Sequence, residues 1–212
     1  MEQVTLEAIP QVQVAPVQTR RRQRIGLYGG TFNPVHTAHL MVADQVGHAL
    51  RLNRVDFLPD AVPPHVDKKT AIDATDRVAM LRLAIQDNPL FGLELAEIQR
   101  GGVSYTYETV KQLKEAHPEN DYYFIIGGDM VDYLPKWYRI NDLLKIVNFV
   151  AVRRPGAKNE SQYPVIWVDV PEVQIASSNI RQRIAQGESI RYLVPTRVEQ
   201  YIKEHDLYHG RN

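Results

Sequence analysis

The sequence has no cysteine, no surplus of charge of either sign and no long apolar run. Without cysteine the chain forms no disulfides and offers no thiolate to a metal, which fits the cytoplasm. Because 25 Lys and Arg balance 25 Asp and Glu, the overall charge favours neither a nucleic-acid nor a membrane partner. No segment approaches the roughly 18 to 20 apolar residues of a membrane span, and the first residues lack the apolar centre of a signal peptide. We therefore expect a cytoplasmic protein in which any anion site is local.

The length and composition of the chain suit a globular domain. The 212 residues are 44% hydrophobic and 24% charged, enough for one domain with a proper core. Residues 1–23 show neither helix nor strand periodicity and contain the triplet Arg20-Arg21-Arg22. We interpret them as a flexible, solvated extension, although the arginines could contact an acidic partner. Residues 24–212 are expected to form a single domain.

Short apolar segments alternate with amphipathic ones from residue 24 onward. The expected strands are 25–28, 54–58, 91–95, 121–126, 148–152 and 165–168. The expected helices are 39–50, 75–86 (capped by Thr75), 105–116, 178–186 and 195–205. This alternation predicts an α/β fold, a Rossmann-like doubly wound parallel sheet with helices on both faces and a C-terminal helical segment.

Residues 24–40 carry the clearest functional signal. An apolar strand runs into Gly29 and Gly30, which permit a sharp turn and a close ligand approach, and Thr31 adds a small donor. A helix N-terminus follows, where free N–H groups and the helix dipole favour an anion. His36 and His39 are three residues apart and can face one bound group, so the segment predicts a phosphate site. A plain tight turn is one alternative, and a zinc site that would need a third ligand is another.

Further polar groups follow later strands. Gly127-Gly128-Asp129 and Arg153-Arg154 come directly after two of them, and ligands of such sheets bind at the carboxyl ends of the strands. Residues 177–181 open a helix with serines placed to cap it and an arginine one turn in, which suits a triphosphate. An ordinary N-cap with a surface arginine is the alternative.

Two other segments point to a second ligand. Trp137, flanked by lysine, tyrosine and arginine, is a candidate platform for a flat ring, although a tryptophan is most often part of the core. The polar loop with His65 and Lys68 could close over a phosphate or be only surface. Glu97 and Arg100 are interpreted as a surface pair without an assigned role.

Several ordered motifs resemble one enzyme family over about residues 24–208. They are Gly29-Gly30-Thr31-Phe32-Asn33-Pro34-Val35-His36-Thr37-Ala38-His39, Pro63-Pro64-His65, Ser104-Tyr105-Thr106, Ile126-Gly127-Gly128-Asp129-Met130, Pro135-Lys136-Trp137-Tyr138 and Ser177-Ser178-Asn179-Ile180-Arg181. The first looks like the T/H-x-x-H signature of the nucleotidylyltransferase superfamily, and the set resembles the bacterial nicotinate mononucleotide adenylyltransferases. The chain departs from the family pattern at Asn33, where aspartate is common, and at Val66-Asp67, where a lysine is expected directly after His65.

The resemblance implies transfer of the adenylyl group of ATP to nicotinate mononucleotide, with Mg²⁺, giving deamido-NAD and pyrophosphate. It implies an ATP site made of Gly29, Gly30, Thr31, Phe32, His36, His39, Gly127, Asp129, Ser177, Ser178, Ile180 and Arg181. It implies a mononucleotide site made of Thr106, Trp137, Tyr138, His65 and Lys68. It assigns catalysis to His36, His39 and Arg181 as charge stabilisers and provides no resident metal-ligand set.

Other functions remain open from the sequence. One is a related adenylyltransferase acting on nicotinamide mononucleotide or phosphopantetheine. Another is a nucleotide-binding regulator without turnover, which the presence of His36, His39 and Arg181 argues against. A homodimer is as compatible with the sequence as a monomer.

Overall fold

A computed structural model of the chain describes residues 22–62, 71–153 and 160–210. Its sheet has six strands in the order β3-β2-β1-β4-β5-β6, and every neighbouring pair is parallel. The strands are β1 (Arg24–Gly30), β2 (Arg54–Pro59), β3 (Phe91–Leu93), β4 (Asp121–Gly127), β5 (Asn148–Arg153) and β6 (Val165–Asp169). The helices are α1 (Thr37–Ala49), α2 (Ala74–Ile85), α3 (Ala96–Arg100), α4 (Thr106–Ala116), the 3₁₀ helix η2 (Gly128–Lys136), α5 (Ile140–Leu143), α6 (Ser177–Ala185) and α7 (Thr196–Glu204).

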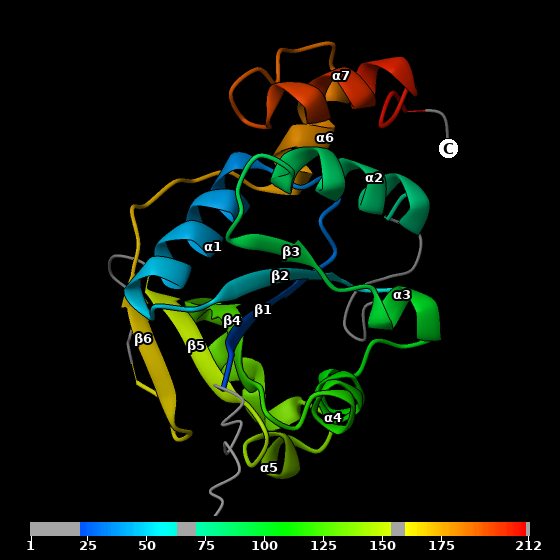
Figure 1. Ribbon diagram of the computed structural model, residues 1–212. Helices are drawn as coiled ribbons and strands as arrows, with labels where there is room; N and C mark the ends of the chain where they lie inside the picture. Colours follow the sequence, from blue (N-terminus) through cyan, green and yellow to red (C-terminus); the bar gives the residue numbers. More distant parts are fainter. Residues whose placement is uncertain (1–21, 63–70, 154–159, 211–212) are drawn as a thin grey trace, which may run out of the picture.

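The sheet is doubly wound, as predicted. Figure 1 shows α1 and α2 on one side of the sheet and α4 and α5 on the other. Strand order reverses between β1 and β4, because β1 lies beside both β2 and β4. In such sheets the crevice at the carboxyl ends of the two strands at this reversal is the usual ligand site. Within the described residues, no helix is long and apolar enough to cross a membrane.

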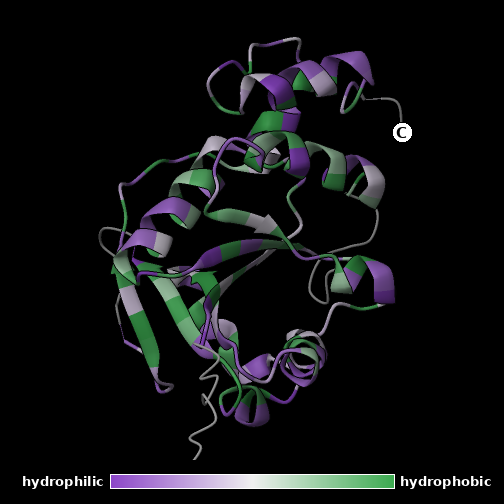
Figure 2. Cartoon of the chain, viewed as in Figure 1, coloured by the Kyte–Doolittle hydropathy of each residue, from purple (hydrophilic) through white to green (hydrophobic). Residues whose placement is uncertain are grey.

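Alternating side chains of the strands build two cores. Along β5, Val150 and Val152 face α1 and α2, whereas Phe149 and Ala151 face α4 and α5. Figure 2 shows the resulting concentration of hydrophobic residues on β5 and β6, with helices that mix hydrophobic and hydrophilic residues around the sheet. A parallel sheet covered on both faces needs such apolar strands, which explains why the sequence pattern identified them.

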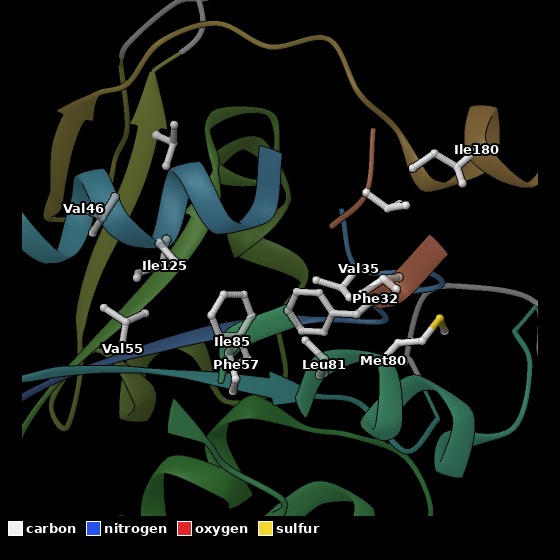
Figure 3. Close-up of a cluster of buried hydrophobic side chains, with 14 of the residues drawn as sticks. Phe32, Val35, Val46, Val55, Phe57, Met80, Leu81, Ile85, Ile125 and Ile180 are labelled. Atoms are coloured by element: carbon white, nitrogen blue, oxygen red, sulfur yellow. The ribbon is translucent and has the colours of Figure 1, made fainter. Parts of the chain in front are cut away.

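The C-terminal helices extend the first core. Ile180 of α6 and Ile202 of α7 are buried in the same cluster as Phe32, Met80 and Leu81. Figure 3 shows Phe32 and Val35 beside Leu81 and Met80 of α2, with Ile180 of the same cluster farther from α2. The C-terminal helical segment is therefore packed on the domain through α2, as Figure 1 also shows for α7.

Several element boundaries differ from the sequence-based expectation. The predicted turn at Gly29 and Gly30 is wrong, because both residues pair with β2 and belong to β1. Helix α1 begins two residues before His39, and α2 is capped by Asp73, whose carboxylate accepts the Thr75 N–H at 2.7 Å. Short elements such as α3 were not predicted, since five residues show no helical periodicity.

A buried arginine joins α2 to the ends of β1 and β2. Arg77 is 2% exposed and donates to the Thr31 carbonyl at 2.8 Å and to the Asp60 carbonyl at 2.8 Å. It also pairs with the Asp60 carboxylate at 3.2 Å, and that carboxylate accepts the Thr31 hydroxyl at 2.7 Å. Burial raises the pKa of Asp60, and the bonds from Thr31 and Arg77 oppose this rise. The ion pair thus fixes the chain where β1 ends.

Arg77→Met should destabilise the fold by about 3 to 5 kcal/mol, because it leaves the Asp60 carboxylate buried without its cation. Urea unfolding followed by circular dichroism measures the change. Arg82→Met, on the exposed face of the same helix, serves as the control and should stay within about 0.5 kcal/mol of wild type. Equal stability of the two variants would contradict the role given to Arg77.

Candidate active site

Two cavities meet at the point where strand order reverses. The first, of about 590 Å³, is lined by His36, His39 and the segment 170–177, and the second, of about 720 Å³, by the end of β1, the start of α4 and the end of η2. Tyr28 and Gly127, on the neighbouring strands β1 and β4, line both. The arrangement can hold two ligands side by side, with their adjoining ends over these two strands.

The glycines of β1 make room for aromatic rings. A Cβ on Gly29 would lie 2.8 Å from the Phe124 ring, and one on Gly30 would lie 3.1 Å from the Phe32 ring. The chain turns after them, at Phe32 with φ 49° and at the cis bond between Asn33 and Pro34. Gly29, Gly30 and Thr31 line the second cavity, whereas the Phe32 side chain is buried in the core.

The two histidines form one stacked unit at the start of α1. Their ring centroids are 3.5 Å apart with 19° between the planes, and the Phe32 ring meets His39 edge-on at 5.0 Å. The backbone N–H of His36 donates to Nδ1 of His39 at 3.2 Å. A neutral His39 therefore carries its proton on Nε2, where it can donate to a ligand.

The environment keeps both rings neutral at pH 7. Burial lowers the pKa of His36 to about 4. Burial, and then the neighbouring His36, lower the pKa of His39 well below its usual value of 6.5. Anionic phosphate beside the rings would favour their protonated forms, so the charge of the pair depends on the ligand. Zinc ligation gains no support, since the described ranges contain no group of three or more His, Cys, Asp or Glu able to hold a metal.

Helix α6 holds the loop between β1 and α1. The Ser177 hydroxyl donates to the Pro34 carbonyl at 2.8 Å, and the Arg181 guanidinium donates to the Asn33 carbonyl at 2.8 Å. The expected serine cap is wrong, because Ala176 is the N-cap residue and no side chain caps α6. The first-turn N–H groups of α6 are thus left for another acceptor.

The predicted residues of this helix have different surroundings. Ser177 lines the first cavity, and Ser178 is exposed. Ile180 is fully buried, so its side chain packs in the core and only its backbone is available to a ligand. Arg181 is partly buried and is not among the lining residues of either cavity.

The second cavity gathers most of the residues predicted for the mononucleotide. Thr106 is the first residue of α4, and Trp137 and Tyr138 follow η2. The Trp137 ring packs edge-on against Phe124 at 5.8 Å and Phe149 at 5.7 Å, so it is both cavity wall and core. Tyr138 is 48% exposed at the rim. His65 and Lys68 lie outside the described residues.

Of the three carboxylates that line the second cavity, Asp60 and Glu97 are buried and Asp129 is exposed. Asp129 belongs to the first turn of η2. Gly127, two residues before it, lines both cavities. A single exposed carboxylate suits a hydrated Mg²⁺ that arrives with a nucleotide better than a dedicated metal cage.

Some residues of the site were missed from the sequence. Asp60 lines the second cavity directly after β2, and its position at a strand end was the signal that could have found it. Tyr208 donates to Oδ1 of Asn33 at 2.8 Å from the far end of the chain, a contact without a local signal. The interpretation of Glu97 as a surface residue is wrong, because it is 4% exposed and accepts a hydrogen bond from Thr109 at 2.8 Å.

Comparison with known proteins places the chain in a family. The family described as cytidylyltransferase-like matches residues 27–183. The chain is 60% identical over 186 residues to the probable nicotinate-nucleotide adenylyltransferase of Lactiplantibacillus plantarum, covering 88% of each chain. It is 55% identical over 197 residues to the protein of the same name from Enterococcus faecalis, covering 93% of this chain and 90% of that one.

Solved structures agree on the fold. The nicotinic acid mononucleotide adenylyltransferase of Plasmodium falciparum, complexed with NaAD, superposes with a TM-score of 0.74 at 20% identity, over 88% of this chain and 98% of that one. An identity this low supports the shared architecture alone. With the family match and the closely similar bacterial sequences, the chain belongs to the cytidylyltransferase-like family and, within it, to the nicotinate-nucleotide adenylyltransferases.

Proposed function

We propose that this protein transfers the adenylyl group of ATP to nicotinate mononucleotide, forming nicotinate adenine dinucleotide and pyrophosphate in NAD biosynthesis. The observation that carries the proposal is the pair of cavities that meet at Tyr28 and Gly127. One has the histidine pair for a polyphosphate, and the other has a helix N-terminus and a tryptophan for a pyridine carboxylate. The names of the bacterial relatives agree with this assignment.

The first cavity is assigned to ATP. An oxygen of the mononucleotide phosphate attacks the α-phosphorus, a new P–O bond forms, and the bond to pyrophosphate breaks. The attacking phosphate is already an anion, so no general base is required and the protein contributes alignment and charge stabilisation. Nε2 of His39 donates to the α-phosphate region, and Arg181 with the first turn of α6 stabilises the leaving pyrophosphate.

The second cavity is assigned to nicotinate mononucleotide. No side chain of the N-cap residue Tyr105 caps α4, so the first N–H groups and the Thr106 hydroxyl can bind the pyridine carboxylate. Trp137 provides an aromatic wall for the pyridine ring. Asp129, at the side of the second cavity that adjoins Gly127, would hold a hydrated Mg²⁺ brought by ATP, and this ion would offset the charge of the phosphates. We also propose that the reaction takes place in the cytoplasm.

The acid mononucleotide should be the better substrate. Nicotinamide mononucleotide lacks the negative charge that the start of α4 would bind, and losing a charged hydrogen bond should lower kcat/KM by about 10- to 100-fold. Steady-state pyrophosphate release with ATP and each mononucleotide measures the ratio. Equal or better use of the amide would overturn the proposed substrate, and no release with either would overturn the activity.

His39→Ala should lower kcat by about 10²- to 10³-fold at saturating substrates, because it removes a donor at the reacting phosphate. The matched control is His48→Ala, on the exposed face of the same helix, which should retain wild-type turnover. Full turnover by the His39 variant would exclude the charge-stabilising role of that ring.

The neutral state of His36 predicts a pH-dependent stability. Its pKa is about 4 in the folded protein and near 6.5 when unfolded, so the unfolded chain binds protons first as the pH falls. The free energy of unfolding should drop by about 2 kcal/mol from this group between pH 7 and pH 5. Urea unfolding at both pH values measures this drop. Wild type and His48→Gln should show the contribution of about 2 kcal/mol from His36, and His36→Gln should lack it. The same pH dependence in all three would refute a buried neutral His36.

A further inference from the structure

A buried polar cluster lies behind the second cavity, away from the histidine pair. It joins Glu97 of α3 to Thr109 of α4, with the exposed Arg100 of α3 at its edge. Thr109 is fully buried, and its hydroxyl donates to Oε1 of Glu97 at 2.8 Å while accepting from the Arg100 guanidinium at 2.9 Å. Burying the Glu97 carboxylate and the Thr109 hydroxyl is unfavourable unless each is hydrogen-bonded, so their mutual bond has one well-defined geometry.

The Glu97 carboxylate holds the start of α4 from both sides. It accepts from the Thr109 hydroxyl at 2.8 Å, three residues after Thr106, and Ser104, two residues before Thr106, lies close enough to lower its pKa. Burial raises the pKa of Glu97, whereas Thr109, Ser104 and Arg100 lower it. One side chain thereby determines where the first turn of α4 lies relative to the cavity.

The same cluster reaches the chain that follows β2. Ser104 Oγ accepts the Ala61 N–H at 2.9 Å, and the Ser104 N–H donates to the Val62 carbonyl at 3.0 Å. Val62 and Val103 also form a parallel bridge. Two walls of the second cavity, the end of β2 and the start of α4, are therefore fixed to each other through Ser104 and thus to Glu97.

Glu97 itself is an unsuitable ligand for the substrate. Its carboxylate borders the cavity near Asp60, and a mononucleotide that carries a carboxylate and a phosphate would be repelled by it. The carboxylate is directed instead to Thr109 of α4 and to the neighbouring Ser104. An effect of Glu97 on the substrate must therefore act through the position of α4.

We infer that Glu97 is a positioning residue, which through Ser104 and Thr109 holds the N-terminus of α4 so that Thr106 and the free N–H groups meet the mononucleotide carboxylate. The inference rests on the proposed function. It predicts that breaking the cluster selectively weakens use of the acid mononucleotide. Binding of ATP should not change, because no residue of α3 or α4 lines the first cavity.

Thr109 offers the sharpest test, because it lines neither cavity and has a nearly isosteric replacement. Thr109→Val removes the hydroxyl and keeps the shape, whereas Thr109→Ser keeps the hydroxyl. In Thr109→Val we expect KM for nicotinate mononucleotide to rise about tenfold and the acid-over-amide ratio of kcat/KM to fall about tenfold, as for the loss of one charged hydrogen bond. KM for ATP should stay within about twofold of wild type, and Thr109→Ser should restore both mononucleotide values.

Glu97→Gln tests the carboxylate directly. As in Thr109→Val, KM for nicotinate mononucleotide should rise and the acid-over-amide ratio of kcat/KM should fall. Glu115→Gln, on the exposed face of α4, should leave them at the wild-type values. Thermal unfolding of each variant separates weaker folding from altered recognition. If Thr109→Val lowers only the melting temperature, or raises both KM values equally, the positioning role is wrong. Wild-type protein without turnover of the acid mononucleotide would instead overturn the proposed function and the inference with it.

Discussion

The site depends on how the loop between β1 and α1 is held. Its carbonyl groups bond to side chains from two separate helices: Thr31 accepts from Arg77 of α2, and Asn33 and Pro34 accept from α6. Tyr208 adds a bond to the Asn33 amide, and burial raises its pKa, so its hydroxyl remains a donor. Because the histidine pair begins directly after this loop, its position is set by helices remote in sequence.

This arrangement allows Arg181 to hold the loop and also to take part in the proposed chemistry. A guanidinium has five N–H donors in a planar fork, and the bond to the Asn33 carbonyl uses one of them. The remaining donors can meet an anion at the first turn of α6 without releasing the loop. A lysine at this position would be a single charge on a flexible stem, without a fork to hold both partners in fixed geometry. At Asn33, where the family pattern commonly has aspartate, the amide oxygen accepts from Tyr208 as a carboxylate oxygen would.

The sequence predicted those features of the fold and of the site that depend on a local pattern of residues. Apolar runs located all six strands, and the groups after β1 and β4 identified the edge of the sheet where both cavities lie. It did not predict contacts between distant segments, such as Arg77 with Asp60 or Tyr208 with Asn33, because each partner alone resembles a surface residue. Glu97 was misjudged for the same reason. Its helix is too short to show periodicity, and the residue is buried where its carboxylate meets Thr109 of α4.

The neutral histidines fit a site that must be stable both empty and filled. Two buried cations side by side would cost desolvation and repel each other in the absence of ligand. The stacked pair avoids this cost, since burial lowers the pKa of both rings. A bound triphosphate shifts the balance toward protonation, so positive charge develops where and when negative charge is present. Each cavity also has a helix N-terminus whose partial charge is permanent, α6 in the first and α4 in the second. The first cavity adds the histidine pair, whose charge can rise to match a polyphosphate, whereas the second needs to bind only a single carboxylate at α4. The two halves of the site thus differ in electrostatics as their proposed ligands differ in charge.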